Sequence, residues 1–258
     1  MSVILTLAVT FFAGMGAGLG TGFAGMSAVT VIGPMLMTFL HVDPYLAIGV
    51  GLASDVLASA VSAWTYGKNK NLDIRNGLVM MASVLVFTVV GSYFSSLLPS
   101  KTMGSFSIYM TILLGIKFLV KPVMATKEKM LEVSAKKRFL QALVCGAMIG
   151  LICGFIGAGG GMMMLLILTS VLGYELKTAV GTSVFIMTFT ALTGAVSHFA
   201  MGGFPNPVIL LLCVVFTLLW ARIAARLANK VDNKVLNRMM GTVLVVLGAA
   251  ILIFNWLT

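Results

Sequence analysis

Charged residues are scarce in this chain of 258 residues, and acidic residues are the scarcest. Aspartate and glutamate together number 7, lysine and arginine number 17, and all charged residues make up only 9% of the sequence. A soluble domain carries about 25% charged residues. Hydrophobic residues make up 60%, and the windows 77–98, 140–161 and 208–221 hold no charge at all. This composition excludes a soluble globular class and predicts an all-α, polytopic membrane protein without a separate soluble domain.

Residue types that carry chemistry in enzymes and metalloproteins are equally few. The chain has 2 histidines and 3 cysteines. Cys145, Cys153 and Cys213 lie in apolar segments and show neither metal-ligand nor CxxC spacing, so we expect them to act as small hydrophobic residues. The sequence has no HExxH, no P-loop and no Ser/His/Asp grouping. We therefore expect no enzymatic activity, no metal and no cofactor.

The net charge of +10 is distributed as in a membrane protein and not as in a nucleic-acid-binding protein. Ten apolar segments can be drawn, at about 3–22, 26–40, 46–66, 76–97, 102–122, 138–157, 161–172, 177–200, 207–228 and 235–257. If the sides of the membrane alternate, sixteen of the 17 Lys and Arg residues fall on one side and only Lys101 falls on the other. Because cytoplasmic loops are rich in Lys and Arg, we predict a multi-pass protein of the cytoplasmic (inner) membrane with both termini outside.

The first half of the chain recurs in the second half at a constant offset of 132 residues. Four glycines of the first half fall on glycines of the second: Gly14 on Gly146, Gly18 on Gly150, Gly22 on Gly154 and Gly25 on Gly157. Each half contains five segments, an odd number, so the second half must enter the membrane upside down. We predict a first membrane repeat at 1–122, a basic cytoplasmic linker at 123–137, and a second, inverted repeat at 138–258.

One segment of each half is too short to cross a bilayer. Segments 26–40 and 161–172 would span only about 22 and 18 Å at about 1.5 Å per residue, against a hydrocarbon core of about 30 Å. Each follows a glycine-rich break, at 18–25 and 154–161. We predict two half-helices whose N-termini meet at the midplane, either as re-entrant hairpins or as parts of broken spanning helices.

Two helix N-termini that face each other form an anion site, because each presents free backbone N–H groups and the positive end of a helix dipole. The residues expected to bind the anion are Gly22, Gly25, Met26 and Ser27 from the first half and Gly157, Gly159, Gly160 and Gly161 from the second. The alternative is that the glycines only allow close helix packing. Packing suits the four-residue spacing of Gly14, Gly18, Gly146 and Gly150 better, whereas three consecutive glycines suit a ligand better.

Several polar side chains within the apolar segments are candidates for coupling anion movement to protons. Asp55 lies at the centre of segment 46–66, and an intramembrane acid is a functional candidate by default. His198 and Tyr66, which the offset pairs, are further candidates. For Asp55 and His198 the alternative is a purely structural hydrogen bond.

The run from Gly146 to Gly161, followed by the segment 179–183, resembles the TauE/SafE family of sulfite exporters over nearly the whole chain. The resemblance implies a transporter of a small anion such as sulfite or an organosulfonate. We expect membrane lipids as its other partners and no binding of nucleic acid. It also marks Thr182 and Ser183 as hydroxyl donors to the substrate. A passive anion channel and a non-transporting membrane scaffold are the alternatives, and the sequence leaves the oligomeric state open.

Overall fold

The computed structural model describes residues 3–96, 103–128, 134–156 and 160–257, and the elements in these ranges are all helices. Ten helices are described: α1 (Val3–Ala24), α2 (Val29–Leu40), α3 (Pro44–Lys68), α4 (Ile74–Ser96), α5 (Met103–Val120), α7 (Ala135–Ile156), α8 (Gly160–Ser170), α9 (Leu176–Gly202), α10 (Pro207–Lys230) and α11 (Asn233–Leu257). Each begins and ends within three residues of a predicted segment. The prediction of ten helical segments is therefore confirmed.

The outer surface of the bundle is apolar enough for a bilayer. Within the described residues, six helices are long and apolar enough to cross a membrane: α1, α3, α4, α9, α10 and α11. Large apolar side chains are exposed along them, among them Val3, Val89 and Val196. A large exposed apolar surface of this kind is unfavourable in water, whereas the lipid chains of a bilayer can cover it. The fold is that of a polytopic α-helical membrane protein.

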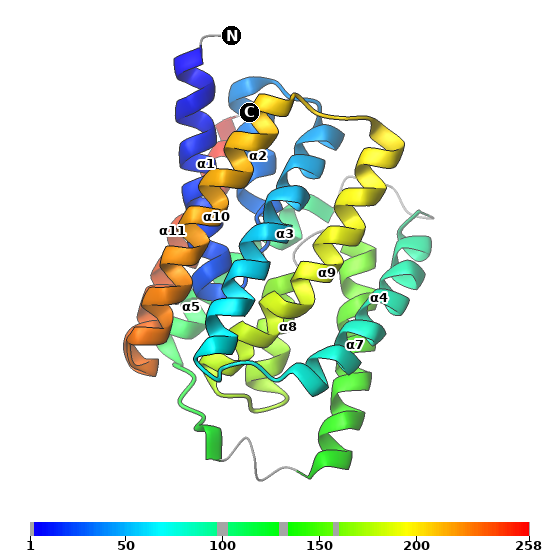
Figure 1. The fold of residues 1–258 in the computed structure, drawn as a ribbon, viewed down its shortest axis with the longest axis vertical. Coiled ribbons are helices and arrows are strands. Elements are labelled where there is room, and N and C mark those ends of the chain that lie inside the picture. The colour runs from blue at the N-terminus through cyan, green and yellow to red at the C-terminus, as the bar shows by residue number, and fades with distance from the viewer. Residues whose placement is uncertain (1–2, 97–102, 129–133, 157–159, 258) are drawn as a thin grey trace.

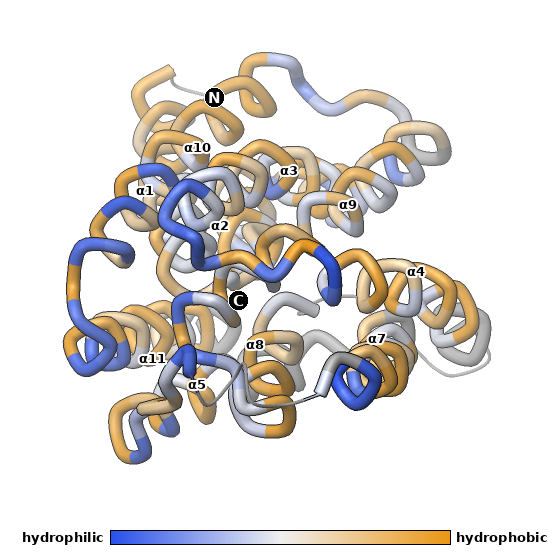
Figure 2. The backbone as a smooth tube through the Cα atoms, turned by 60° about the horizontal axis from the view of Figure 1, so that its bottom comes forward, coloured by the Kyte–Doolittle hydropathy of each residue, from blue (hydrophilic) through white to orange (hydrophobic). Residues whose placement is uncertain are grey.

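The helices run between two ends of the bundle (Figure 1). The first described residues of α1 and the last of α11 lie near one end, at the top of the view, and residues 121–128 lie at the other. In Figure 2 the lower end of Figure 1 is turned toward the viewer, and hydrophilic residues gather in the connections at that end. The helices are hydrophobic over most of their length. The end that we predict to be cytoplasmic therefore lies opposite the end at which α1 begins and α11 ends.

Glycines hold α1 against α10 and α7 against α4. A Cβ atom on Gly18 would lie 2.6 Å from the Thr217 carbonyl oxygen, and one on Gly150 would lie 2.6 Å from the Val84 carbonyl oxygen. Both distances are too short for a real side chain, so the backbones touch because these residues have none. Close packing through small residues is the usual device in membranes, and it accounts for Gly14 and Gly146 as well.

The ends of the two short helices repeat each other at the 132-residue offset. The residue after α2, His41, has φ +48°, and its counterpart Gly173, beyond α8, has φ +67°. The next residues, Val42 and Tyr174, donate their N–H groups to Leu36 and Leu168, at 3.2 and 2.9 Å. This hydrogen bond across six residues belongs to a left-handed helix cap. The repeat seen in the sequence therefore has a local structural counterpart.

Helices α3 and α9 pack against each other at the centre, again through paired positions. Gly49 of α3 faces Phe199 and His198 of α9, and Gly181 of α9 faces Tyr66 of α3. Gly49 and Gly181 are related by the offset, as are Tyr66 and His198. These contacts are the ones that two related halves would make, and the inverted orientation of the second half stays a prediction.

Candidate functional site

The two short helices begin beside each other at the centre of the bundle. The chain leaves helical structure at 25–28, between α1 and α2, and α8 begins at Gly160. A Cβ atom on Gly161 would overlap the carbonyl oxygen of Gly25. Gly25 has φ +62°, a conformation that glycine adopts most readily, and a Cβ there would lie 2.5 Å from Ser183 Oγ. The two breaks are therefore in direct backbone contact, as the sequence predicts.

The break after α1 is stabilised by its own hydrogen bonds. The N–H groups of Gly25 and Met26 donate to Thr21 and Gly20, at 2.9 and 3.1 Å. The Thr21 hydroxyl lies within hydrogen-bonding distance of the carbonyl oxygens of Ala17 and Met26, at 2.9 and 2.8 Å. Irregular backbone at membrane depth needs partners of this kind or a cavity to line. Here it has both, because a pocket opens beside it.

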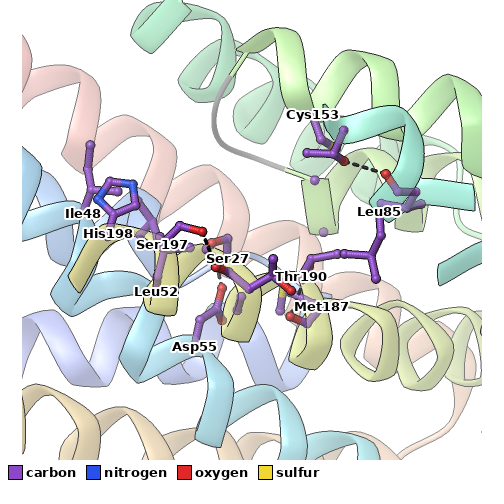
Figure 3. A pocket seen from close by; sticks show the side chains of 18 of the residues that line it. Ser27, Ile48, Leu52, Asp55, Leu85, Cys153, Met187, Thr190, Ser197 and His198 are labelled. Atoms are coloured by element: carbon purple, nitrogen blue, oxygen red, sulfur yellow. Dashed lines mark hydrogen bonds between the residues drawn. The ribbon is translucent and has the colours of Figure 1, made fainter. Parts of the chain in front are cut away.

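A pocket of about 370 Å³ lies next to the meeting point of the two helices (Figure 3). Its walls come from α3, α4, α7, α8 and α9, from the first residue of α2 and from the break before it, so both halves of the chain contribute. Of the predicted site residues, Ser27, Asp55, Gly160, Gly161 and His198 line it. Most of the remaining lining is apolar. An apolar pocket with a few convergent polar groups is the usual form of a small-molecule site.

Among the described residues that line this pocket, Asp55 is the only acidic one, and only 1% of its surface is exposed. The Ser27 hydroxyl donates a hydrogen bond of 2.7 Å to its Oδ2 atom. The backbone N–H of Ala28, just before α2, also lies near the carboxyl group. Within the described part of the chain, Oδ1 has no hydrogen-bond partner. The start of α2 thus already faces an acidic group of the protein itself.

His198 lines the same pocket at the end away from Cys153 (Figure 3). Its ring stacks on Tyr45 with centroids 4.2 Å apart, and its Nδ1 atom lies 3.3 Å from the Tyr45 carbonyl oxygen. Tyr66 is placed differently. It is fully buried, it donates its hydroxyl to the Gly22 carbonyl at 3.0 Å, and it does not line the pocket.

The other predicted binding residues lie around the pocket and not in its wall. Gly22 packs on α10, where a Cβ would lie 2.5 Å from the Ala221 carbonyl oxygen. Met26 is fully buried. Thr182 accepts the Asp73 N–H at 3.2 Å, and Ser183 donates to the Val180 carbonyl at 2.9 Å.

Gly22, Met26, Thr182 and Ser183 make these local contacts in the structure, and their role in anion binding stays a prediction. Gly25 likewise does not line the pocket, although its backbone borders it through Gly161. Gly157 and Gly159 lie outside the described residues.

Sequence reasoning missed a row of hydroxyl groups on α9. Thr190, Thr193 and Ser197 line the pocket together with Gly194. Their spacing of three to four residues places them on one helix face, and this spacing is the signal that could have identified them. Thr193 and Ser197 each donate to the carbonyl four residues earlier, at 2.9 Å. A hydroxyl held in this way can still accept a hydrogen bond, but it can donate one to an anion only if it breaks its bond to the backbone.

Comparison with known proteins points to one family. The family described as "Sulfite exporter TauE/SafE" matches residues 10–251. The chain is 26% identical over 198 residues to a "Probable membrane transporter protein YunE" of Bacillus subtilis (strain 168), covering 72% of each chain. It is 21% identical over 206 residues to the "Probable membrane transporter protein YdhB" of the same organism, covering 80% of this chain and 84% of that one.

Proposed function

The chain belongs to the sulfite exporter TauE/SafE family and is a multi-pass membrane transporter, and on this premise we propose that it exports a small anion, sulfite or an organosulfonate. The export crosses the cytoplasmic membrane by alternating access around the pocket beside Gly25 and Gly161. The observation that carries the proposal is the meeting of the α2 and α8 N-termini at a pocket lined by both halves of the chain.

The chemistry of the site suits an oxyanion. Each helix start presents backbone N–H groups without helical partners and the positive end of a dipole, together equivalent to about half an elementary charge. None of the described residues that line the pocket is a Lys or an Arg. An anion is therefore attracted by partial charges and released again, which a transporter needs, and is not held by a full ion pair.

Asp55 gives this site a means of coupling to protons. While ionised, it takes the hydrogen bond of Ser27 and repels an incoming anion. Once protonated, it no longer repels the anion, and the Ser27 hydroxyl and the α2 N–H groups become available to the substrate. Proton binding and anion binding then reinforce each other, and this coupling is reciprocal.

The coupling has a consequence for direction. Moving an anion together with a proton favours uptake when the proton gradient points inward. Net export then depends on an outward anion gradient. The membrane potential contributes only when the anion carries more negative charge than the protons that move with it, as a dianion does with one proton. In this scheme the linker at 123–137 lies in the cytoplasm and both termini lie outside.

Flux into proteoliposomes tests the proposal. Purified protein should transport an organosulfonate with saturation, and an imposed pH gradient should drive it. Conduction that neither saturates nor responds to the pH gradient would identify a channel. No flux of any tested anion, with the protein folded, would favour a scaffold.

A further inference from the structure

A second pocket, of about 380 Å³, lies at the predicted cytoplasmic end of α3 and α10. It is lined by Val61, Trp64, Thr65, Lys68, Asn69, Arg222 and Arg226. It shares no residue with the first pocket. The functional proposal above does not use it.

Within the part of the chain that the structure describes, the lining of this pocket carries three positive charges and no acidic residue. Arg222 and Arg226 are four residues apart on α10 and therefore lie on the same helix face. Lys68 is in the last turn of α3, so it brings the third charge from the other half of the chain. Two guanidinium groups beside an ammonium suit a phosphate, because a guanidinium binds phosphate oxygens through two parallel hydrogen bonds.

On the N-terminal side of these basic residues, α3 and α10 each carry apolar side chains that face outward. On α3, the positions before Lys68 on this face are Leu57, Val61 and Trp64, and Trp64 is 67% exposed. On α10, Leu219 is exposed one turn before Arg222. Arg222 itself precedes the end of α10 at Lys230 by about 12 Å of helix rise. Both helix faces thus change from apolar to basic in the same direction.

Trp64 marks the depth of this change. Tryptophan is enriched at the level of the lipid headgroups, and the Lys68 ammonium lies 5.0 Å from the centroid of the Trp64 rings. Long basic side chains within an apolar segment direct their charges to the same level. The pocket is therefore at the depth where lipid phosphates lie.

We propose that this pocket binds the phosphodiester headgroup of an anionic membrane phospholipid, with an acyl chain lying along Leu57, Val61 and Leu219. Basic pockets between membrane helices on the cytoplasmic side are suited to such headgroups. A free anion would meet three cations open to water, where ion pairs contribute little. A lipid adds apolar contact along both helices, and it joins α3 of the first half to α10 of the second.

The test compares two double variants of the full-length protein in detergent. Arg222→Gln/Arg226→Gln removes two charges from the pocket. Lys234→Gln/Arg238→Gln removes two charges with the same spacing from the predicted cytoplasmic end of α11, at residues that do not line the pocket. Dioleoyl phosphatidylglycerol should raise the melting temperature of the parent and of the α11 variant, and it should raise that of the Arg variant much less. Dioleoyl phosphatidylcholine should give little protection to any of them.

Native mass spectrometry gives a second measurement, since the Arg variant should retain fewer phosphatidylglycerol molecules than the α11 variant. Equal lipid protection of the two double variants would overturn the proposal. So would equal protection of the parent by inorganic phosphate, because the pocket would then be a site for free anions. If the Arg variant does not fold, Lys68→Gln replaces it, with the same outcomes expected at smaller size.

Discussion

Replacing Asp55 by Asn should remove the pH dependence of anion binding. The Asn side chain is neutral and close in size to the protonated carboxyl group, so it neither repels the anion nor holds the Ser27 hydroxyl as strongly as the carboxylate does. A negative charge about 6 Å from a bound anion, at an effective dielectric constant of about 20, repels it by about 3 kcal/mol. That repulsion corresponds to about 100-fold in affinity. It is present only while Asp55 is ionised.

The sign of the effect follows from which form binds the anion. Protonated Asp55 permits tight binding, so the affinity of the parent is highest at low pH. As the pH rises and Asp55 ionises, the dissociation constant should increase by up to about tenfold per pH unit, over about 100-fold in total. The dissociation constant of the Asp55→Asn variant should stay close to the lowest value of the parent throughout about pH 5 to 8, the range in which histidine also titrates.

The assay is calorimetric titration of purified protein with methanesulfonate. A sulfonate keeps its single charge over this range, whereas sulfite takes up a proton itself and would obscure the result. Asp43→Asn is the matched control. Asp43 is exposed and caps the start of α3 by accepting the Tyr45 and Leu46 N–H groups, and Asn is an equally good cap. If the dissociation constant of the Asp55→Asn variant depends on pH as that of the parent does, Asp55 is structural. His198 then becomes the next candidate for proton coupling.

Three further predictions concern the binding site, the topology and the helix caps. Gly160→Ala should weaken methanesulfonate binding by about tenfold, about 1.4 kcal/mol, because Gly160 lines the pocket. The fold should be retained, since among the described residues the added methyl meets only the Cys153 side chain, at 2.8 and 3.6 Å. Gly33→Ala, whose nearest contact is 3.9 Å away, should bind as the parent does, and equal binding by both variants would contradict the role of Gly160. A cysteine at Phe204 should react with an impermeant thiol reagent in intact cells and one at Asn69 should not; labelling at Asn69 would reverse the orientation. His41→Gly should raise the melting temperature, because a left-handed conformation costs a residue other than glycine about 1 kcal/mol. Gly173→Ala should lower the melting temperature for the same reason. An unchanged melting temperature in both variants would show that the caps carry no strain.

The sequence was sufficient for the helices because lipid imposes one simple rule on them. Each spanning segment must be apolar over a fixed length, and each break needs glycine, proline or charge, so the bounds of α3 or α10 follow from composition. The contact between Gly25 and Gly161 could also be predicted from the sequence, because the 132-residue offset identifies both glycine-rich breaks. Ser27 and Gly160 were predicted from these breaks, and Asp55 was predicted as an acid inside a membrane segment. All three line the pocket, and their role in binding stays a prediction.

What the sequence could not supply was the rotation of each helix about its own axis. Thr182 and Tyr66 belong to central helices, yet their side chains turn to Asp73 and Gly22 and not to the pocket. Which face of α9 meets the pocket depends on how Gly49 and Gly181 seat α3 against it, and that is a property of two helices together. The hydroxyl groups of Thr190, Thr193 and Ser197 were missed for this reason.

The contact of Gly161 with the Gly25 carbonyl limits how the protein could change over evolutionary time. No side chain fits at position 161 without displacing the backbone of the other half, and position 25 holds a conformation that other residues resist. Positions 25 and 161, where the two halves touch beside the pocket, therefore accept almost no single substitution that could alter the preference of the pocket. We expect selectivity to evolve through the surrounding wall, where Ser27 and the hydroxyl groups of α9 can be exchanged one at a time.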